Sequence, residues 1–158
     1  MDDSLTKKVL AYLRQHNVMT IATTGTHGPW AAAVFYANRG FTLYFLSAPT
    51  TRHSEDIEAR GAVAVTIQED YRNWREIQGI QIEGQAVRLQ GVERATAMVR
   101  YLKKYPFVRD PLGAVPEIAR ALNHVTWYKI EPSRLYFIDN SVGLGHRDDV
   151  VLSRSTKM

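Results

Sequence analysis

The stretch Leu43–Arg60, LYFLSAPTTRHSEDIEAR, decides the fold of this chain. Its apolar beginning predicts a strand over Thr42–Ser47 that enters a short polar turn around Pro49. A helix is expected over Arg52–Arg60, because Gly61 follows as a residue that commonly ends helices. The first N–H groups of this helix therefore lie close to the end of an apolar strand.

This turn and the start of the helix gather side chains that suit an anion. The hydroxyls of Ser47 and Thr51 stand near Arg52 and His53, where a helix N-terminus carries unpaired N–H groups and partial positive charge. One interpretation is an ordinary surface helix capped by Thr50 or Thr51. The other is a phosphate site, and we favour it because two basic side chains at a helix start are unfavourable unless an anion compensates them.

The rest of the chain alternates between strand-like and helical patterns. The expected strands are Val18–Thr24, Trp30–Ala37, Thr42–Ser47, Ala62–Gln68, Gln78–Leu89, His124–Ile130 and Arg134–Ile138. The expected helices are Ser4–His16, Arg52–Arg60, Val92–Tyr105 and a short one over Glu117–Leu122, and Asn38–Gly40 is expected to form a tight hairpin turn. Short turns between consecutive strands indicate antiparallel pairing, and this number of strands favours a closed or nearly closed barrel.

Length and composition point to one globular domain over residues 1–158, mainly β with helices (α+β), ending in an irregular tail over residues 140–158. The net charge of +4 is spread along the chain without a run of Lys or Arg, so no nucleic-acid partner is expected. The absence of cysteine excludes disulfides and thiolate chemistry. No stretch has the pattern of a membrane span or a signal peptide, so we expect a cytoplasmic protein without a membrane partner.

The polar residues form no recognisable catalytic motif. None of the five histidines pairs with another at helical spacing, so no metal site is expected. There is no phosphate-binding glycine loop, dinucleotide fingerprint or nucleophile elbow. The carboxylate pairs Glu55–Asp56 and Asp148–Asp149 are expected to be solvated, and no catalytic residue can be named.

The run Ala31–Ala33 inside an expected strand is unusual, because alanine is depleted in strands. Small side chains there allow a flat ring to approach the backbone, or allow tight packing against a bulky neighbour. The sequence favours neither explanation over the other.

Taken in order, these segments resemble the pyridoxamine 5′-phosphate oxidase-like flavoproteins, which adopt the FMN-binding split β-barrel. The resemblance is carried by WAAAVFYANRGFTLYFLS, PTTRHSEDIEARGAVAVTI and IQGIQIEGQAVRLQG, over roughly Val18–Leu102, and by the closing segment HVTWYKIEPSRLYFID. It implies an antiparallel split β-barrel with six to seven strands and peripheral helices.

The resemblance also implies a homodimer that holds two FMN molecules at its interface. The phosphate would lie at the helix after the third strand, where the family commonly has an Arg-Lys pair and this chain has Arg52 and His53. The isoalloxazine ring would lie beside the second strand, and Trp127 would come from the partner subunit. The cofactor-binding residues implied in this way are Ala32, Ala33, Val34, Leu46, Ser47, Thr51, Arg52, His53, Gln81 and Trp127.

The function expected from this resemblance is that of an FMN-dependent oxidoreductase acting on an unidentified small molecule. Pyridoxamine phosphate is not assigned as the substrate, because the arginine and histidine pattern that binds it near the family's C-terminus is not found here. The alternatives are a flavin- or haem-binding carrier or sensor without turnover, and a deazaflavin-dependent reductase.

Overall fold

The structure, a computed structural model, describes residues 3–108, 120–122 and 124–152. The helices are α1 (Asp3–Gln15), α2 (Arg52–Ala59) and α3 (Gly91–Lys104), with the short 3-10 turns η1 (Trp74–Glu76) and η2 (Pro106–Val108). The strands are β1 (Val18–Gly25), β2 (Gly28–Phe35), β3 (Ala37–Arg39), β4 (Thr42–Ser47), β5 (Ala62–Gln68), β6 (Gln78–Arg88), β7 (Thr126–Asp139) and β8 (Arg147–Asp149).

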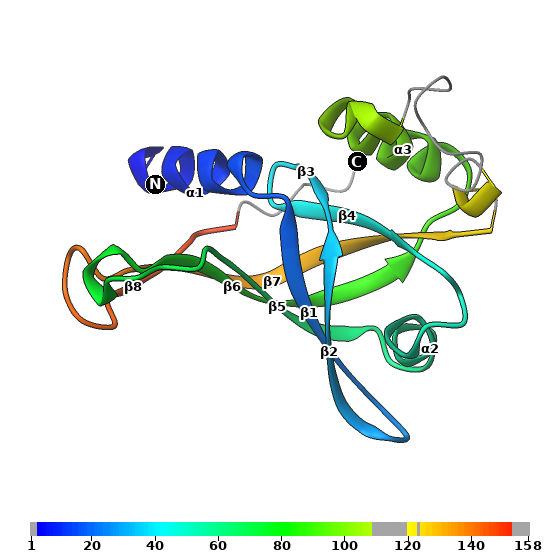
Figure 1. Cartoon of the computed structure of the whole chain (residues 1–158), viewed down its shortest axis with the longest axis horizontal. Helices are drawn as coiled ribbons and strands as arrows, with labels where there is room; N and C mark the ends of the chain where they lie inside the picture. The colour runs from blue at the N-terminus through cyan, green and yellow to red at the C-terminus, as the bar shows by residue number, and fades with distance from the viewer. Residues whose placement is uncertain (1–2, 109–119, 123, 153–158) are drawn as a thin grey trace.

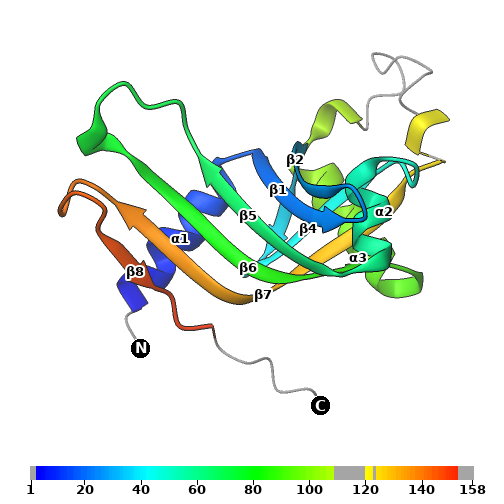
Figure 2. The same cartoon turned by 90° about the horizontal axis from the view of Figure 1, so that it is seen from below.

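All these strands belong to one antiparallel sheet in the order β2-β1-β5-β6-β7-β4-β3, with β8 beside β7. The two ends of this order, β2 and β3, are separated in the chain by Tyr36 alone. Because one residue joins the outermost strands, the sheet has to curl until its ends come close together. Figures 1 and 2 show the resulting curled half-barrel, which confirms the expected antiparallel, mainly β class.

The inner face of the half-barrel holds the main core. Alternate residues of β1, β5, β6 and β7 point inward, as expected for a sheet with one buried face. Val9 and Leu13 of α1 and Ile57 of α2 complete this cluster. A second, smaller cluster lies under α3, where Tyr101 packs edge-on against Trp127 of β7 at 5.4 Å between ring centroids.

Polar contacts join the helices to the chain junctions beside them. The hydroxyl of Tyr36, which is fully buried, donates to the carbonyl of Leu13 at 2.8 Å. The ammonium of Lys104, at the end of α3, donates to the carbonyl of His16 and lies 4.2 Å from the Tyr36 ring centroid. Burial lowers the pKa of Lys104 to about 8. These contacts fix α1 and α3 at the point where the sheet changes from β2 to β3.

Several expected boundaries were wrong. The strand expected over Trp30–Ala37 is broken at Tyr36 into β2 and β3, because the chain turns there from one end of the sheet to the other. Residues 38 and 39, expected in a turn, pair with β4, so the hairpin loop is Gly40-Phe41. The helix expected over Glu117–Leu122 lies largely outside the described residues.

The end of the chain is also more regular than expected. The two strands expected on either side of residues 131–133 form one long strand, β7, in which Ser133 is an extra residue opposite Glu83 and Gly84. A β-bulge of this kind tolerates Pro132, which has no N–H for the ladder. The tail expected to be irregular contains β8, which pairs with the end of β7.

Gly84 provides a test of this bulge. A Cβ added at Gly84 would lie 2.7 Å from the carbonyl oxygen of Glu131 and 3.1 Å from Cγ2 of Ile130. We expect Gly84→Ala to lower the free energy of unfolding by about 1–3 kcal/mol, as overpacking in a core does. Urea unfolding measures this, and Gly143→Ala is the control because a Cβ at Gly143 meets nothing within 4 Å. Equal stability of the two variants would contradict the close approach.

The N-cap of α2 gives a second test. Thr51 has extended backbone angles and its hydroxyl accepts a hydrogen bond from the N–H of Ser54, whereas Thr50 is exposed in the turn. We expect Thr51→Ala to cost about 0.5–2 kcal/mol of stability, the usual effect of losing a cap. Thr50→Ala should change the urea midpoint little. The opposite ranking of these two variants would show that the cap is misassigned.

Candidate functional site

Four residues at the junction of β4 and α2 are called here the α2 corner: Ser47, Thr51, Arg52 and His53. The side chains of Ser47, Thr51 and His53 form a compact polar cluster. Ser47 ends β4 and His53 lies in the first turn of α2, and each is only 8% exposed. Nε2 of His53 lies 2.7 Å from the Ser47 hydroxyl and 3.2 Å from the Thr51 hydroxyl. The two hydroxyls are 3.0 Å apart, so three polar groups converge at the start of the helix.

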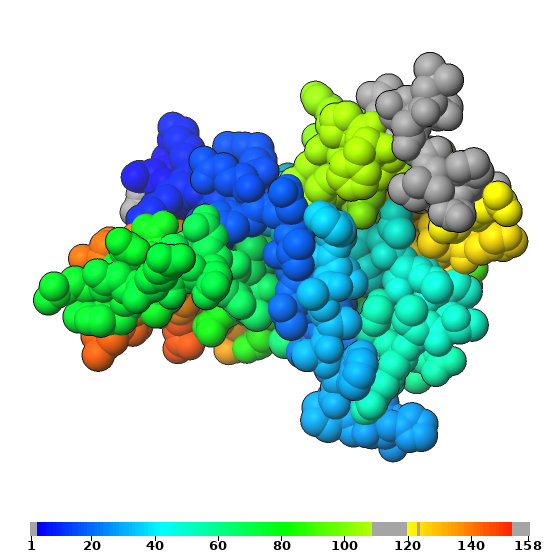
Figure 3. Space-filling model, viewed as in Figure 1, coloured from blue at the N-terminus to red at the C-terminus, as the bar shows by residue number. Residues whose placement is uncertain are grey.

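Arg52 extends from this corner toward the β1–β2 hairpin, which projects from the body of the molecule in Figure 3. Nη2 of Arg52 donates to the carbonyl of His27 at 2.7 Å, and the guanidinium lies 4.6 Å from the Trp30 ring centroid. Nε of Arg52 is buried and has no hydrogen-bond partner among the described residues. The side chain is thus held in place while one of its donors is left for another group.

The charge of the α2 corner rests mainly on Arg52. Burial lowers the pKa of His53, and the nearby carboxylate of Asp56 opposes this shift. The imidazole is therefore neutral at pH 7, since its ordinary pKa of about 6.5 is already below that pH. The conflict expected between two cations and the helix dipole is smaller than the sequence indicates.

Asp56 was expected to be solvated, and this expectation was wrong. Its side chain is buried, with Oδ2 accepting a hydrogen bond from the Thr23 hydroxyl at 2.7 Å. A Cβ at Gly25 would lie 1.8 Å from Oδ1 of Asp56, so the carboxylate occupies the space that this glycine leaves free. The spacing of His53, Asp56 and Ile57, at i, i+3 and i+4 on one helix face, is the signal that would have indicated its burial.

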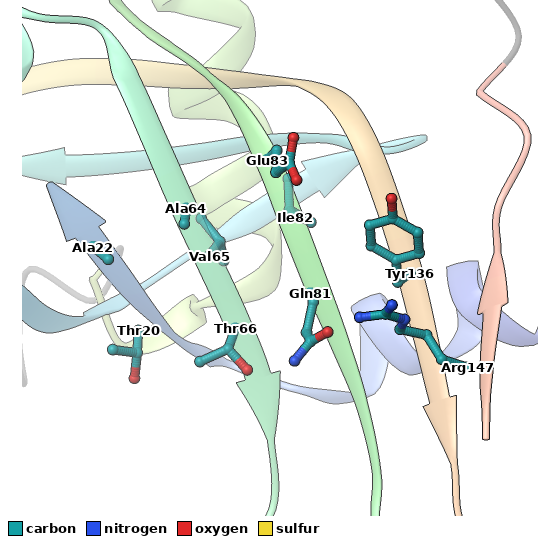
Figure 4. Close-up of a pocket in the computed structure, with 10 residues that line it drawn as sticks. All are labelled: Thr20, Ala22, Ala64, Val65, Thr66, Gln81, Ile82, Glu83, Tyr136 and Arg147. Carbon is teal, nitrogen blue, oxygen red and sulfur yellow. The ribbon is translucent and has the colours of Figure 1, made fainter. Parts of the chain in front are cut away.

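The outer face of the sheet carries a second group of candidate residues. The strand register aligns Ala33, Thr20, Thr66, Gln81 and Tyr136 in one row across five strands. A hollow of about 330 Å³ lies over this row from Thr20 to Tyr136, without Ala33, and a neighbouring one of about 420 Å³ shares Ala22, Ala64 and Glu83 with it. Figure 4 shows the Gln81, Tyr136 and Arg147 side chains grouped at one side of the first hollow. The guanidinium of Arg147 lies 4.8 Å from the Tyr136 ring centroid.

Within one chain, the residues implied by the resemblance lie in four separate places. Ser47, Thr51, Arg52 and His53 lie together in the α2 corner. Ala33 and Gln81 lie on the outer sheet face, whereas Ala32 and Val34 pack against the core from the other face of β2. Leu46 and Trp127 form a registered pair in the cluster under α3.

Trp127 needs a separate comment, because it was expected to reach the site of a partner subunit. Its ring is 2% exposed within its own chain, and its Nε1 has no hydrogen-bond partner among the described residues.

In the part of the chain that the structure describes, no three His, Cys, Asp or Glu side chains gather as a metal site. No helix there is long and apolar enough to cross a membrane.

Comparison with known proteins identifies the fold and the family. The model of the pyridoxamine 5′-phosphate oxidase family matches residues 5–139. A UPF0306 protein of Klebsiella pneumoniae is 30% identical over 138 residues, which cover 86% of each chain.

Solved structures agree on the fold. The haem-binding protein from Mycobacterium smegmatis superposes with a TM-score of 0.69 at 19% identity, over 89% of this chain, which spans 56% of that protein. The haem storage protein HutZ from Vibrio cholerae superposes with a TM-score of 0.69 at 13% identity, over 90% of this chain and 99% of HutZ. With the curled sheet and its flanking helices, these matches confirm the split β-barrel, and the chain belongs to the pyridoxamine 5′-phosphate oxidase family.

Proposed function

We propose that this protein is a cytoplasmic FMN-binding flavoprotein that works as a homodimer and acts as an oxidoreductase on a small molecule. The observation that carries the proposal is the buried, unpartnered Nε of Arg52 at the N-terminus of α2. A guanidinium with an unused donor, fixed beside the first N–H groups of a helix, suits a phosphate group. Membership of the family supplies the reason to choose FMN as the carrier of that phosphate.

The residues of the α2 corner fit this group chemically. Arg52 offers a permanent positive charge, and the hydroxyl of Ser47 is a hydrogen-bond donor that can turn toward an anion, whereas the Thr51 hydroxyl donates to the carbonyl of Ala48. The Arg52 guanidinium is already oriented by the His27 carbonyl and the Trp30 ring, so little side-chain freedom would be lost on binding. When bound, FMN supplies the hydride and electron chemistry, while the protein supplies binding and orientation.

The separation of the implied residues supports a dimer. In a single chain, Gln81 lies on the outer sheet face, whereas α2 packs Ile57 into the inner core. The outward positions of β1, β2 and β5 carry no charged side chain, although charged residues make up 23% of the chain. A neutral face can meet its own copy without placing like charges together. We therefore propose that the ring is enclosed by residues from two subunits.

Haem binding without turnover is the second candidate, because the M. smegmatis protein and HutZ share this fold. Haem iron needs an axial ligand, often a histidine with a free ring nitrogen. His16 and His53 are the most buried histidines, and the Nε2 of each is engaged, by Glu69 at 2.7 Å and by Ser47 at 2.7 Å. The geometry therefore favours a phosphate-bearing flavin over haem.

The cofactor bound by the purified protein distinguishes the candidate functions. We expect the protein, purified or mixed with excess FMN, to show a flavin absorbance spectrum and to release a molecule with the mass of FMN. A Soret band would instead indicate haem, and a released deazaflavin would indicate the third alternative. Turnover with a reductant and an acceptor distinguishes an oxidoreductase from a carrier.

Arg52→Ala tests the location of the phosphate. We expect this change to weaken FMN binding by about 1.5–3 kcal/mol, the usual contribution of a hydrogen bond to a charged group. Fluorescence titration of FMN measures the affinity. Lys7→Ala is the control, since Lys7 is an exposed residue of α1 that pairs with Asp3. Equal FMN affinity of wild type and Arg52→Ala would place the phosphate elsewhere.

A further inference from the structure

His53 lies in surroundings that accept either of its protonation states. Its Nε2 contacts two hydroxyls, those of Ser47 and Thr51, and the Ser47 hydroxyl itself is 3.0 Å from the Thr51 hydroxyl. A hydroxyl can donate to a neutral imidazole nitrogen or accept from a protonated one. The Thr51 hydroxyl donates to the carbonyl of Ala48 at 3.0 Å, so it can only accept from His53. The α2 corner can therefore change its charge by rotation of the Ser47 O–H bond toward Thr51, without moving the heavy atoms.

Few other charges face His53 in the described residues. On its own helix the neighbours are Arg52 and the buried Asp56. From β7, Tyr128 reaches α2 and donates to Oε1 of Glu58 at 3.3 Å. The strands β1, β2 and β4 contribute no charged side chain, and Glu83 and Arg88 of β6 are exposed on the far side of that strand. The state of His53 therefore depends strongly on any anion placed in the corner.

We propose that His53 takes up a proton when a phosphate group binds at the α2 corner, so that discrimination between a phosphorylated and an unphosphorylated flavin increases as the pH falls. This inference rests on the proposed function. It assigns to His53 a role that a permanently charged residue could not have. Arg52 supplies affinity for phosphate at every pH, and His53 adds a contribution that depends on protons.

The sign of the effect follows from the two states of the imidazole. Without ligand, burial keeps the pKa of His53 below its ordinary value, so the ring is neutral at pH 7. A bound phosphate dianion favours the imidazolium and raises that pKa. Between the two pKa values binding takes up a proton, and affinity rises as pH falls. Below about pH 6 the free phosphate itself becomes protonated, and the gain levels off.

The test compares FMN with riboflavin, which lacks the phosphate. From about pH 8.5 to about pH 7, we expect FMN affinity to increase about three- to tenfold and riboflavin affinity to stay constant. Isothermal titration calorimetry in buffers of different ionisation enthalpy counts the protons taken up. A positive proton number for FMN and zero for riboflavin is expected in the wild type, and this measurement needs no variant.

Variants of His53 test whether this residue takes up the proton when FMN binds. His53→Gln keeps a hydrogen-bonding side chain and should abolish both the pH dependence and the proton uptake. His53→Lys should bind FMN at least as tightly at about pH 8.5 as at about pH 7, without proton uptake. His124→Gln, at an exposed histidine, is the matched control and should behave like the wild type.

Two failures are distinguishable. FMN binding that depends on Arg52 but shows no proton uptake would overturn the role of His53 and leave the proposed function standing. FMN binding that is absent, or unaffected by Arg52→Ala, would overturn both. Proton uptake that persists in His53→Gln would assign the proton to another group and overturn the inference.

Discussion

The architecture depends on one covalent constraint: a single residue, Tyr36, joins the strands at the two ends of the sheet. An open sheet with this strand order would hold β2 and β3 at opposite edges, so the chain can be continuous only if the sheet curls. The curl in turn creates an inner face, which α1 and α2 help to cover, and a second, smaller hydrophobic cluster lies under α3. The buried Tyr36 hydroxyl and the Lys104 ammonium hold this junction against the end of α1.

The same curl decides where the α2 corner lies. Asp56 joins the helix to Thr23 near the end of β1, while Ser47 reaches the helix from β4. These two strands are far apart in the order of the sheet, yet one short helix contacts both. The corner is therefore a product of barrel closure as well as of the local turn. Its geometry combines an ordinary N-cap, made by Thr51, with an arginine that is positioned by a neighbouring hairpin.

Local patterns predicted much of this structure. The strand, turn and helix around Thr51 follow from an apolar run, a polar turn and a cap, all of which act within a few residues. The break at Tyr36 could not be predicted, because tyrosine suits a strand and only tertiary curling interrupts it there. The continuity of β7 was missed because Pro132 is a turn signal that a bulge accommodates. The burial of Asp56 depends on Gly25, which is distant in sequence, and the pairing of the short polar β8 depends on β7.

The composition of the strands has a consequence for how the chain reaches its native state. β1, β2 and β5 contain no charged residue at all and are rich in alanine and β-branched side chains. Segments of this kind self-associate readily while they are exposed. In this chain β5 is bounded by charges, with Arg60 before it and Glu69 and Asp70 after it. β1 and β2 are joined by a loop of only two residues, so their pairing can form early, and the hairpin then covers one edge of each of these two uncharged strands.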